Sequence, residues 1–449
     1  MKVCWKQRIQ VGRAYQFPAT ADGEPPNRTY KMLEEILSRE NMTKALRRVE
    51  SNKGCSGVDG METGDLLPFL NAEWAFIKTE ILDGTYKPKA VKQVEIPKPN
   101  GDKRKLGIPT VLDRLIQQAI SQKLNEMYDE GFSENSYGFR PQRSAHQAVI
   151  RAQEYLNAGY TKVIEFDLEK FFDKVNHDRL MTTLARRITD KRVLKLIHKY
   201  LKGGVMIGGM MSLRTEGTPQ GSPLSPILSN IVLDELDKEL EHRGHKFVRY
   251  ADDLSIYVRS EKSAVRVKES ITRFIEGKLK LKVNQTKSKI SSPQDSQLLG
   301  FSYDYDGQIF QIRISKKSCL KFKEKLRELT SRKWSINMEE RLKRMKNTTI
   351  GWVNYFRIAK CRNLLKDFDG WIRFRLRMCK WKTWKRIRTR IANLVKLGMF
   401  KSQAIRFGNT RKGCCRIAHS PILTMTMTNN YFTKLGYVKL EDVYLKWQS

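Results

Sequence analysis

Two adjacent acids, Asp252 and Asp253, lie between apolar runs in the segment FVRYADDLSIYV, residues 247–258. The β-branched and aromatic residues on either side are typical of two short strands, so the sequence predicts a hairpin with both acids at its tip. A third acid, Asp167, lies near the end of the alternating segment KVIEFDL, residues 162–168, which indicates another strand. Three carboxylates on neighbouring strand ends would repel one another unless cations lay between them.

Carboxylate oxygens at an open site suit Mg²⁺, which favours one or two carboxylates together with substrate phosphates. Two such ions can activate a 3′-hydroxyl and stabilise a leaving pyrophosphate. An Asp-Asp pair alone is common in surface turns, and that is the alternative interpretation. The presence of Asp167 at the end of a separate strand favours the metal site.

The rest of the chain is strongly basic. Its 449 residues carry a formal net charge of +37, with a pI near 9.9. Residues 311–449 hold 35 Lys and Arg against 8 Asp and Glu, whereas the first 310 residues hold 50 against 40. Such a balance predicts a polyanionic partner, with nucleic acid as the first choice. A surface tuned for solubility is the alternative.

The cysteines and histidines indicate no zinc module, because the seven Cys form no C-x-x-C pair and the six His are scattered. An odd number of Cys in a large chain fits a reducing compartment. The basic start of the chain is followed by no apolar core of a secretory signal, and no run of 18 apolar residues occurs. We therefore expect a cytoplasmic protein without a membrane partner.

The elements that must position the acids can be read from apolar periodicity. Helices are predicted over residues 30–50, 66–83, 110–128, 142–157, 177–201 and 227–242, and strands within 94–109, 162–168 and 247–258. This order predicts an α+β fold with a small antiparallel sheet that carries the acids at one end. After residue 315 the strand signals fade, and basic helices are predicted over 316–330, 339–358 and 362–396.

The last of these helices is expected to be amphipathic. Its apolar residues from Phe374 to Leu394 keep a spacing near 3.6, and Arg373, Arg377 and Lys380 lie off that stripe. One face of the helix would then pack against the rest of the protein, while the other would lie along a phosphate backbone. The alternative is that the three cations only solvate the helix.

The motifs DLEKFFD, TPQGSPLSPILSN and RYADD, in this order and spacing, resemble those of reverse transcriptases. YGFRPQRSAHQA (137–148) and the basic region from GWVNYF to WIRFRLR (351–377) are similar to the proteins encoded by bacterial group II introns. The resemblance covers roughly residues 30–449. It implies a right-hand polymerase of fingers and palm, then a helical thumb, or maturase domain, and a basic C-terminal region. The implied divisions are a loose arm (1–29), a finger extension (30–90), fingers and palm (91–310), the thumb (311–396) and a DNA-binding region (397–449).

The resemblance also implies roles for single residues. The expected metal ligands and catalytic acids are Asp167, Asp252 and Asp253, with the backbone carbonyl of Leu168 as a further ligand. The expected nucleotide-binding residues are Lys98, Arg104, Phe172 and Gln220, and the expected template contacts are Arg140 and Arg143. In the thumb, the cations that would bind nucleic acid are Arg373, Arg377 and Lys380.

Two of these roles depend on local geometry. Lys98 and Arg104 face the nucleotide together only if the turn is Asn100-Gly101-Asp102, which pairs residue 98 with 104. The alternative for both is a generic basic hairpin. Phe172, five residues after Asp167, matches the residue that rejects a ribose 2′-hydroxyl, and its alternative is a packed core aromatic.

The function implied by the resemblance is that of an RNA-directed DNA polymerase that is also an intron maturase, with two Mg²⁺ ions as cofactor and Mn²⁺ as a substitute. Its partners would be intron RNA, an RNA template with a DNA primer, target DNA and dNTPs, and a homodimer stays open. Cys414 and Cys415 are adjacent and His419 stands alone, unlike the paired metal ligands of the family's C-terminal endonuclease. We therefore expect that domain to be absent.

Two alternative functions remain. One is a domesticated relative that serves DNA repair or defence, and the other is an RNA-binding splicing factor that no longer polymerises. The three acids, Gln220 and the finger pair argue against the second.

Overall fold

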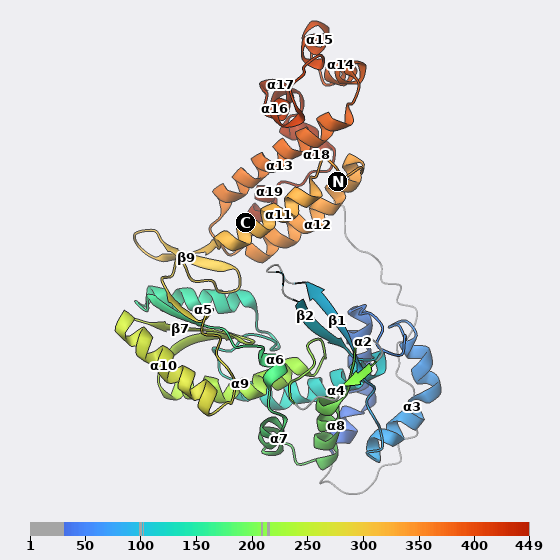
Figure 1. Cartoon of the computed structure of the whole chain (residues 1–449), viewed down its shortest axis with the longest axis vertical. Coiled ribbons are helices and arrows are strands. Elements are labelled where there is room, and N and C mark those ends of the chain that lie inside the picture. Colours follow the sequence, from blue (N-terminus) through green and yellow to red (C-terminus); the bar gives the residue numbers. More distant parts are fainter. Residues whose placement is uncertain (1–30, 98–100, 102, 208–209, 213–215, 449) are drawn as a thin grey trace. The chain divides into compact units, whose positions relative to one another are not determined.

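The computed structural model describes residues 31–97, 101, 103–207, 210–212 and 216–448. It divides into two compact units (Figure 1). The described residues of Met1–Tyr155, with Gly159–Ser291, form the first unit, and Leu156–Ala158 with Ser292–Ser449 form the second. The division after Ser291 groups the hairpin of β9 (Phe301–Tyr305) and β10 (Phe310–Ile314) with the C-terminal helices.

The first unit mixes helices and short strands, as expected. Its helices are α1 (Met32–Ile36), α2 (Arg39–Ser51), α3 (Leu66–Leu82), α4 (Val111–Tyr128), α5 (Ala145–Asn157), α6 (Phe171–Lys174), α7 (His177–Ala185), α8 (Lys191–Lys202), α9 (Ser225–His242) and α10 (Glu261–Gly277). Its strands are β1 (Val91–Pro97), β2 (Lys103–Ile108), β3 (Lys162–Phe166), β4 (Val205–Ile207), β5 (Met210–Ser212), β6 (Lys246–Tyr250), β7 (Asp253–Val258) and β8 (Lys289–Ser291).

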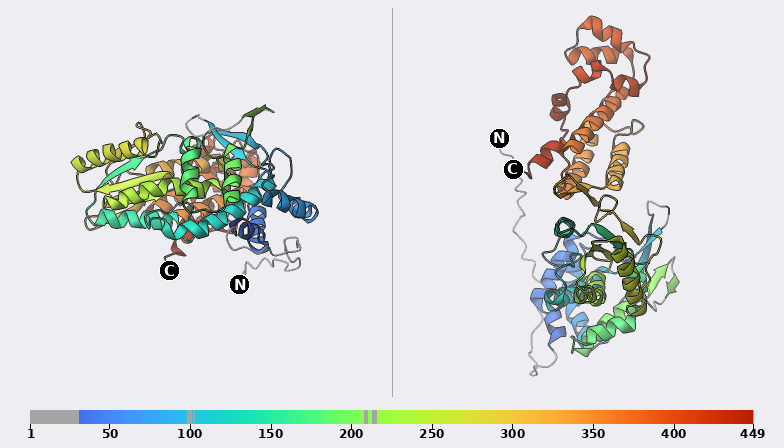
Figure 2. Two further views of the ribbon diagram at one scale, coloured as in Figure 1. Left: turned by 90° about the horizontal axis from the view of Figure 1, so that it is seen from below. Right: turned by 90° about the vertical axis from the view of Figure 1, so that its left-hand side faces the viewer.

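The central sheet of this unit has the strand order β6-β7-β3-β8, and all of its neighbouring strands run antiparallel. Strand β7 is buried from Leu254 to Val258 without alternation, because its two faces are both covered. Helix α9 contacts β6, and α10 contacts β3 and β7 (Figure 2). Ile164, Phe247 and Ile256 lie in the core between these layers.

A second sheet has the order β2-β1-β4-β5. The hairpin of β1 and β2 is antiparallel, as predicted, and its register pairs Ile96 with Arg104 and Pro97 with Lys103. The predicted pairing of residue 98 with 104 is therefore wrong, because Ile96 takes that position. Lys98 itself lies outside the described residues.

Three predicted helices are each divided in two, and in two of them a side chain caps a new helix inside the predicted range. Ser38 accepts a hydrogen bond from the backbone N–H of Asn41, which begins α2, and Asp190 caps α8 in the same way. The basic helix predicted over 362–396 ends at Thr383, where Trp384 turns away from the helix and is buried beside Trp381. The guanidinium of Arg390 donates to the Trp384 carbonyl (3.0 Å) and so satisfies a helix-end acceptor.

The second unit is helical apart from its hairpin. Its helices are α11 (Lys316–Leu329), α12 (Met338–Phe356), α13 (Arg362–Thr383), α14 (Ile387–Lys396), α15 (Lys401–Gly408), α16 (Cys414–Ala418), α17 (Pro421–Thr426), α18 (Asn429–Lys434) and α19 (Leu440–Leu445). Phe322 and Trp352 stack with ring centroids 4.0 Å apart, and Phe368 packs edge-on against both rings. These contacts join α11, α12 and α13 around one core.

Residues 437–441 are hydrogen-bonded to a buried carboxylate of α13. Asp369 accepts hydrogen bonds from the Tyr437 hydroxyl and from the backbone N–H groups of Leu440 and Glu441. The α+β class, with a helical C-terminal part, is confirmed. Within the described ranges, no helix is long and apolar enough to cross a membrane.

Candidate functional site

The two adjacent acids lie where the sequence predicts them, at the turn between β6 and β7. Tyr250 pairs with Asp253, so Ala251 and Asp252 form a two-residue turn in which Ala251 has a φ of +58°. On the other side, β3 pairs with β7 as far as Phe166 and Leu254. The next residues in that register are Asp167 and Asp253, so the three acids gather at one end of the sheet.

The electrostatics of this group show mutual repulsion. Burial of the carboxyl among its neighbours, followed by the charges of Asp252, Asp167 and Glu165, raises the pKa of Asp253 to about 6, although the residue as a whole is exposed. Burial and the charge of Asp167 also raise the pKa of Asp252, against the opposing effect of Arg104 and Arg249. Carboxylates held together against their repulsion are suited to cations.

A complete metal cage is not preformed. Among the residues that the structure describes, no three His, Cys, Asp or Glu side chains converge closely enough to hold an ion by themselves. Mg²⁺ is commonly held by one or two carboxylates and completed by water and substrate phosphates, so an incomplete set of acids fits this ion. The chemistry of the donors, all oxygen, also fits.

The strand end that carries Asp167 is held by a loop that sequence reasoning did not single out. The backbone N–H of Asp167 donates to the Ser288 hydroxyl (3.0 Å), and its carbonyl accepts from the Asn284 backbone N–H (2.8 Å). The Lys287 ammonium lies 3.5 Å from the Asp167 carboxylate, and Leu168 bridges to Val283. Only the polar run VNQTKS, between two apolar segments, could have indicated this loop.

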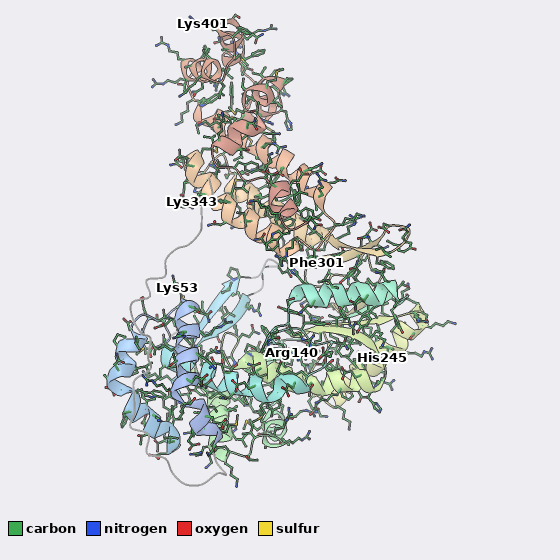
Figure 3. All side chains as sticks on the ribbon, turned by 180° about the vertical axis from the view of Figure 1, so that it is seen from behind. Lys53, Arg140, His245, Phe301, Lys343 and Lys401 are labelled. Carbon is green, nitrogen blue, oxygen red and sulfur yellow. The ribbon has the colours of Figure 1, made fainter. Side chains whose placement is uncertain are left out.

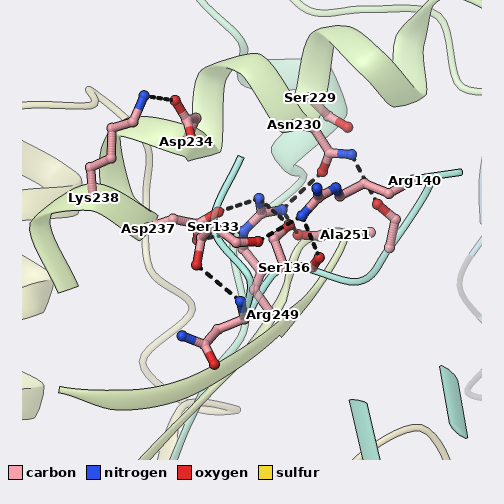
Figure 4. Close-up of polar contacts among 12 residues, drawn as sticks. Ser133, Ser136, Arg140, Ser229, Asn230, Asp234, Asp237, Lys238, Arg249 and Ala251 are labelled. Atoms are coloured by element: carbon pink, nitrogen blue, oxygen red, sulfur yellow. Dashed lines mark hydrogen bonds and ion pairs between the residues drawn. The ribbon is translucent and has the colours of Figure 1, made fainter. Parts of the chain in front are cut away.

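One buried arginine, Arg249, fixes the turn between β6 and β7 that carries Asp252 and Asp253, here called the acidic turn (Figure 4). From the sequence alone, no role was predicted for this arginine. The Arg249 guanidinium forms two hydrogen bonds with the Asp237 carboxylate, one of them 2.7 Å long, and both side chains are almost fully buried. It also donates to the side chains of Asn230 (3.0 Å) and Ser136 (2.7 Å). Its remaining bond, to the carbonyl of Ala251 (2.9 Å), reaches the turn itself.

Three of the four predicted nucleotide-binding residues, Arg104, Phe172 and Gln220, line a cavity of about 800 Å³ in the first unit. The Arg104 guanidinium donates to the Gln220 side chain (2.9 Å). Phe172 is half-buried and packs edge-on against Phe171, so its ring contributes both to the core and to the cavity.

The loop that carries Gln220 is pressed between two neighbouring segments, which explains its glycines. Gly217 and Gly221 have φ of +86° and +113°. A Cβ atom at Gly217 would lie 2.8 Å from the Asp173 carbonyl, and one at Gly221 would lie 2.8 Å from that of Gly107. Only glycine allows these close approaches, and they hold Gln220 beside β2.

The predicted template contacts are less well supported. The Arg140 side chain is 3% exposed, and its guanidinium donates to Asp129 and to the carbonyls of Ser133 and Ser136. The structure thus gives Arg140 a role in the fold, and because it also lines the cavity with Arg104 and Gln220, its contact with the template stays a prediction. Arg143 is partly exposed and pairs with Glu134.

In the second unit, the predicted polar face of α13 needs a correction. Arg377 is buried, and its guanidinium donates to the Met427 carbonyl (3.3 Å). Arg373 and Lys380 are partly exposed. The end of α13 and the segment after it carry exposed cations, among them Lys382, Lys385 and Arg388, and side chains extend outward around Lys401 as well (Figure 3).

Comparison with known proteins matches both units to described families. Residues 96–303 match the reverse transcriptase (RNA-dependent DNA polymerase) family, and residues 319–398 match the maturase-specific domain of group II introns. Protein YkfC of Escherichia coli is 34% identical over 61% of this chain and 82% of its own length. The group II intron-encoded protein LtrA of Lactococcus lactis is 30% identical over 64% of this chain and 57% of its own length.

Among solved structures, a telomerase from Candida albicans is similar with a TM-score of 0.42 and 14% identity, over 73% of this chain and 67% of that one.

Proposed function

Since the chain belongs to the family of group II intron-encoded reverse transcriptases and maturases, we propose that it copies RNA into DNA by a two-metal mechanism and assists the splicing of an intron RNA. The observation that carries the proposal is the gathering of Asp167, Asp252 and Asp253 at one sheet end. Arg104, in the nucleotide cavity, is close enough for its charge to act on Asp252.

In this proposal Asp167, Asp252 and Asp253 hold two Mg²⁺ ions, with the Leu168 carbonyl as a further ligand, and Mn²⁺ can replace Mg²⁺. The metals supply activation of the primer 3′-hydroxyl and stabilisation of the leaving pyrophosphate. The chain's own part is to hold the carboxylates in place through Arg249 and the 283–288 loop.

The nucleotide would be bound in the cavity beside these acids. Arg104 supplies positive charge for its phosphates, and Lys98 remains proposed as a second cation. Gln220 borders the nucleotide, and the Phe172 ring occupies the space beside the 2′ position of its sugar. Arg143 remains a proposed contact of the template strand.

The second unit would bind intron RNA through its exposed cations, because residues 371–440 contain 17 Lys and Arg and no Asp or Glu. Target DNA is proposed to contact residues 397–449. The proposed location is the cytoplasm, with association to the nucleoid when bound to DNA.

Primer extension on an RNA template with a DNA primer and dNTPs tests the proposal directly. We expect Mg²⁺-dependent cDNA synthesis by the full chain. RNA binding without any extension would instead support the splicing factor. A protein that extends primers but neither binds nor splices an intron RNA encoded around its reading frame would support the domesticated polymerase.

A further inference from the structure

One exposed aromatic residue beside the nucleotide cavity has a backbone conformation that disfavours it. Phe139, within the YGFR motif, has a φ of +60°, and its side chain is 47% exposed. Among the described non-glycine residues with positive φ, it is the one aromatic. A bulky side chain rarely adopts this conformation, and such strain persists only where surrounding contacts impose it.

The neighbours of Phe139 in sequence impose it. The backbone N–H of Tyr137 donates to the Arg249 carbonyl (2.9 Å), and the Asn230 side chain donates to the Gly138 carbonyl (2.9 Å). On the other side, the buried guanidinium of Arg140 is fixed by its own hydrogen bonds. The backbone is thus held before and after Phe139, while the ring is left exposed.

Gly138 shows how tightly the motif is placed. A Cβ atom there would collide with the backbone of Tyr250 and Ala251, at the turn that carries the two acids. The buried group around Arg249 therefore fixes the acidic turn and the backbone of Phe139 together (Figure 4).

The cavity in which Phe139 takes part has the composition of a nucleic-acid site. Arg48, Arg104 and Arg114 line it with Phe139. Among the described residues of this unit, the other strongly exposed phenylalanine is Phe76. It lines a different cavity, whose charged side chains include the acids Asp59, Glu73 and Glu80 as well as two lysines. Positive charge favours phosphates, and an exposed ring in the same cavity offers a flat surface for a base.

We propose that Phe139 is a stacking platform for a nucleobase in this cavity, either of the incoming nucleotide or of the template. The inference rests on the proposed polymerase function and adds a residue that none of the assignments above includes. The strained backbone is then retained because it holds the ring toward the bound base, and not because the fold requires a phenylalanine there.

The test compares Phe139→Gly with Phe139→Tyr, which keeps the ring, and with Phe76→Ala as a matched control. Glycine adopts positive φ without strain, so we expect the thermal midpoint of Phe139→Gly to be equal to or above that of the wild type. Removing the platform should nevertheless weaken base binding roughly tenfold or more. Phe139→Tyr and Phe76→Ala should stay close to the wild type.

Two readouts separate the sources of the base. A raised KM for a single dNTP, at saturating template and primer, identifies the base of the nucleotide. Loss of quenching of 2-aminopurine at the templating position identifies the template. If Phe139→Gly kept both the wild-type KM and the wild-type quenching, the proposal would be overturned, whether or not the thermal midpoint of the variant fell. If the wild type extends no primer, the polymerase function fails, and the fluorescence measurement still decides whether Phe139 stacks on a base.

Discussion

At the residue scale, Asp253 combines a proposed catalytic position with a cost to the fold. Its carboxylate is held near two others, and its pKa of about 6 lies above the ordinary value of 3.8. The proposed metals would remove that repulsion. Two kinds of measurement, activity and stability, therefore report on the same carboxylate.

Replacement of Asp252 or Asp253 by Asn should abolish Mg²⁺-dependent cDNA synthesis, because one metal loses a charged ligand. Binding of intron RNA should persist, since we propose that it depends on cations of the second unit. Primer extension and filter binding measure the two properties. Extension at the wild-type rate by either variant would show that the acids hold no catalytic metal.

The stability of the metal-free protein should change in the opposite direction. A carboxyl with a raised native pKa disfavours the folded state once it ionises, so its cost appears as pH rises from about 4 to above 6. Asp253→Asn removes this cost and should raise the thermal midpoint in EDTA at pH 8, with little effect at pH 4. Added Mg²⁺ should raise the midpoint of the wild type more than that of the variant. A lower midpoint at pH 8 would contradict the assigned direction of the pKa.

Phe172 decides sugar selection in our proposal. Phe172→Ala should admit ribonucleotides, because loss of the ring opens space beside the 2′ position. The ratio of dNTP to rNTP incorporation measures this effect, and Phe172→Tyr serves as a control that keeps the ring. An unchanged ratio in Phe172→Ala, with reduced stability, would leave Phe172 as a core residue packed on Phe171.

At the scale of elements, the acidic turn depends on how Arg249 joins β6 to α9. A lysine keeps the charge but lacks the planar fork, and it has fewer donors than the five hydrogen bonds that Arg249 makes to Asp237, Asn230, Ser136 and the Ala251 carbonyl. Arg249→Lys should therefore raise the Mg²⁺ concentration needed for half-maximal extension by several-fold, measured below its unfolding temperature. Arg243→Lys, at an exposed ion pair with Glu239, is the matched control and should change little. A wild-type Mg²⁺ requirement in Arg249→Lys would limit Arg249 to a role in stability.

The same scale shows what the sequence could predict. The strands around Asp167 and the Asp252–Asp253 pair were predictable, because apolar residues mark them and acids end them. The register of β1 and β2 was not, because a basic turn gives no apolar pattern that fixes the pairing. The division of the basic helix at Thr383 was also hidden, since Trp384 keeps helical spacing in sequence while it packs as a turn residue.

Buried polar groups were the least predictable. Arg140 was expected to contact the template, and Arg249 was only the neighbour of the two acids in the sequence. Their contacts alone show that Arg249 holds the acidic turn and Arg140 a neighbouring loop. Arg377 was expected to be exposed, because it lies off the apolar stripe of α13. The sequence pattern does not reveal that the segment near Met427 covers its side chain.

At the scale of the whole molecule, the charge is divided unequally between regions, and this division suggests separate tasks. The basic stretch of residues 371–440 has no acids to neutralise it, whereas many cations of the first unit are paired, such as Lys44 with Glu40 and Lys238 with Asp234. Paired cations release few counterions when a polyanion binds. RNA affinity should therefore depend on the second unit more than its share of the chain indicates.

Replacement of Lys382, Lys385 and Arg388 by Ala tests this division, because all three are exposed and lie together at the end of α13 and the start of α14. Loss of about three phosphate contacts should reduce the slope of log affinity against log salt by roughly 2–3 units. Splicing should fall with RNA affinity, while extension of a short preformed hybrid should fall less, since the three acids are unchanged.

The matched control replaces three paired cations, Lys44, Lys103 and Lys238, and should leave the slope near that of the wild type. If both triple variants reduced the slope equally, net charge alone would govern RNA binding, and the second unit would hold no special share of it.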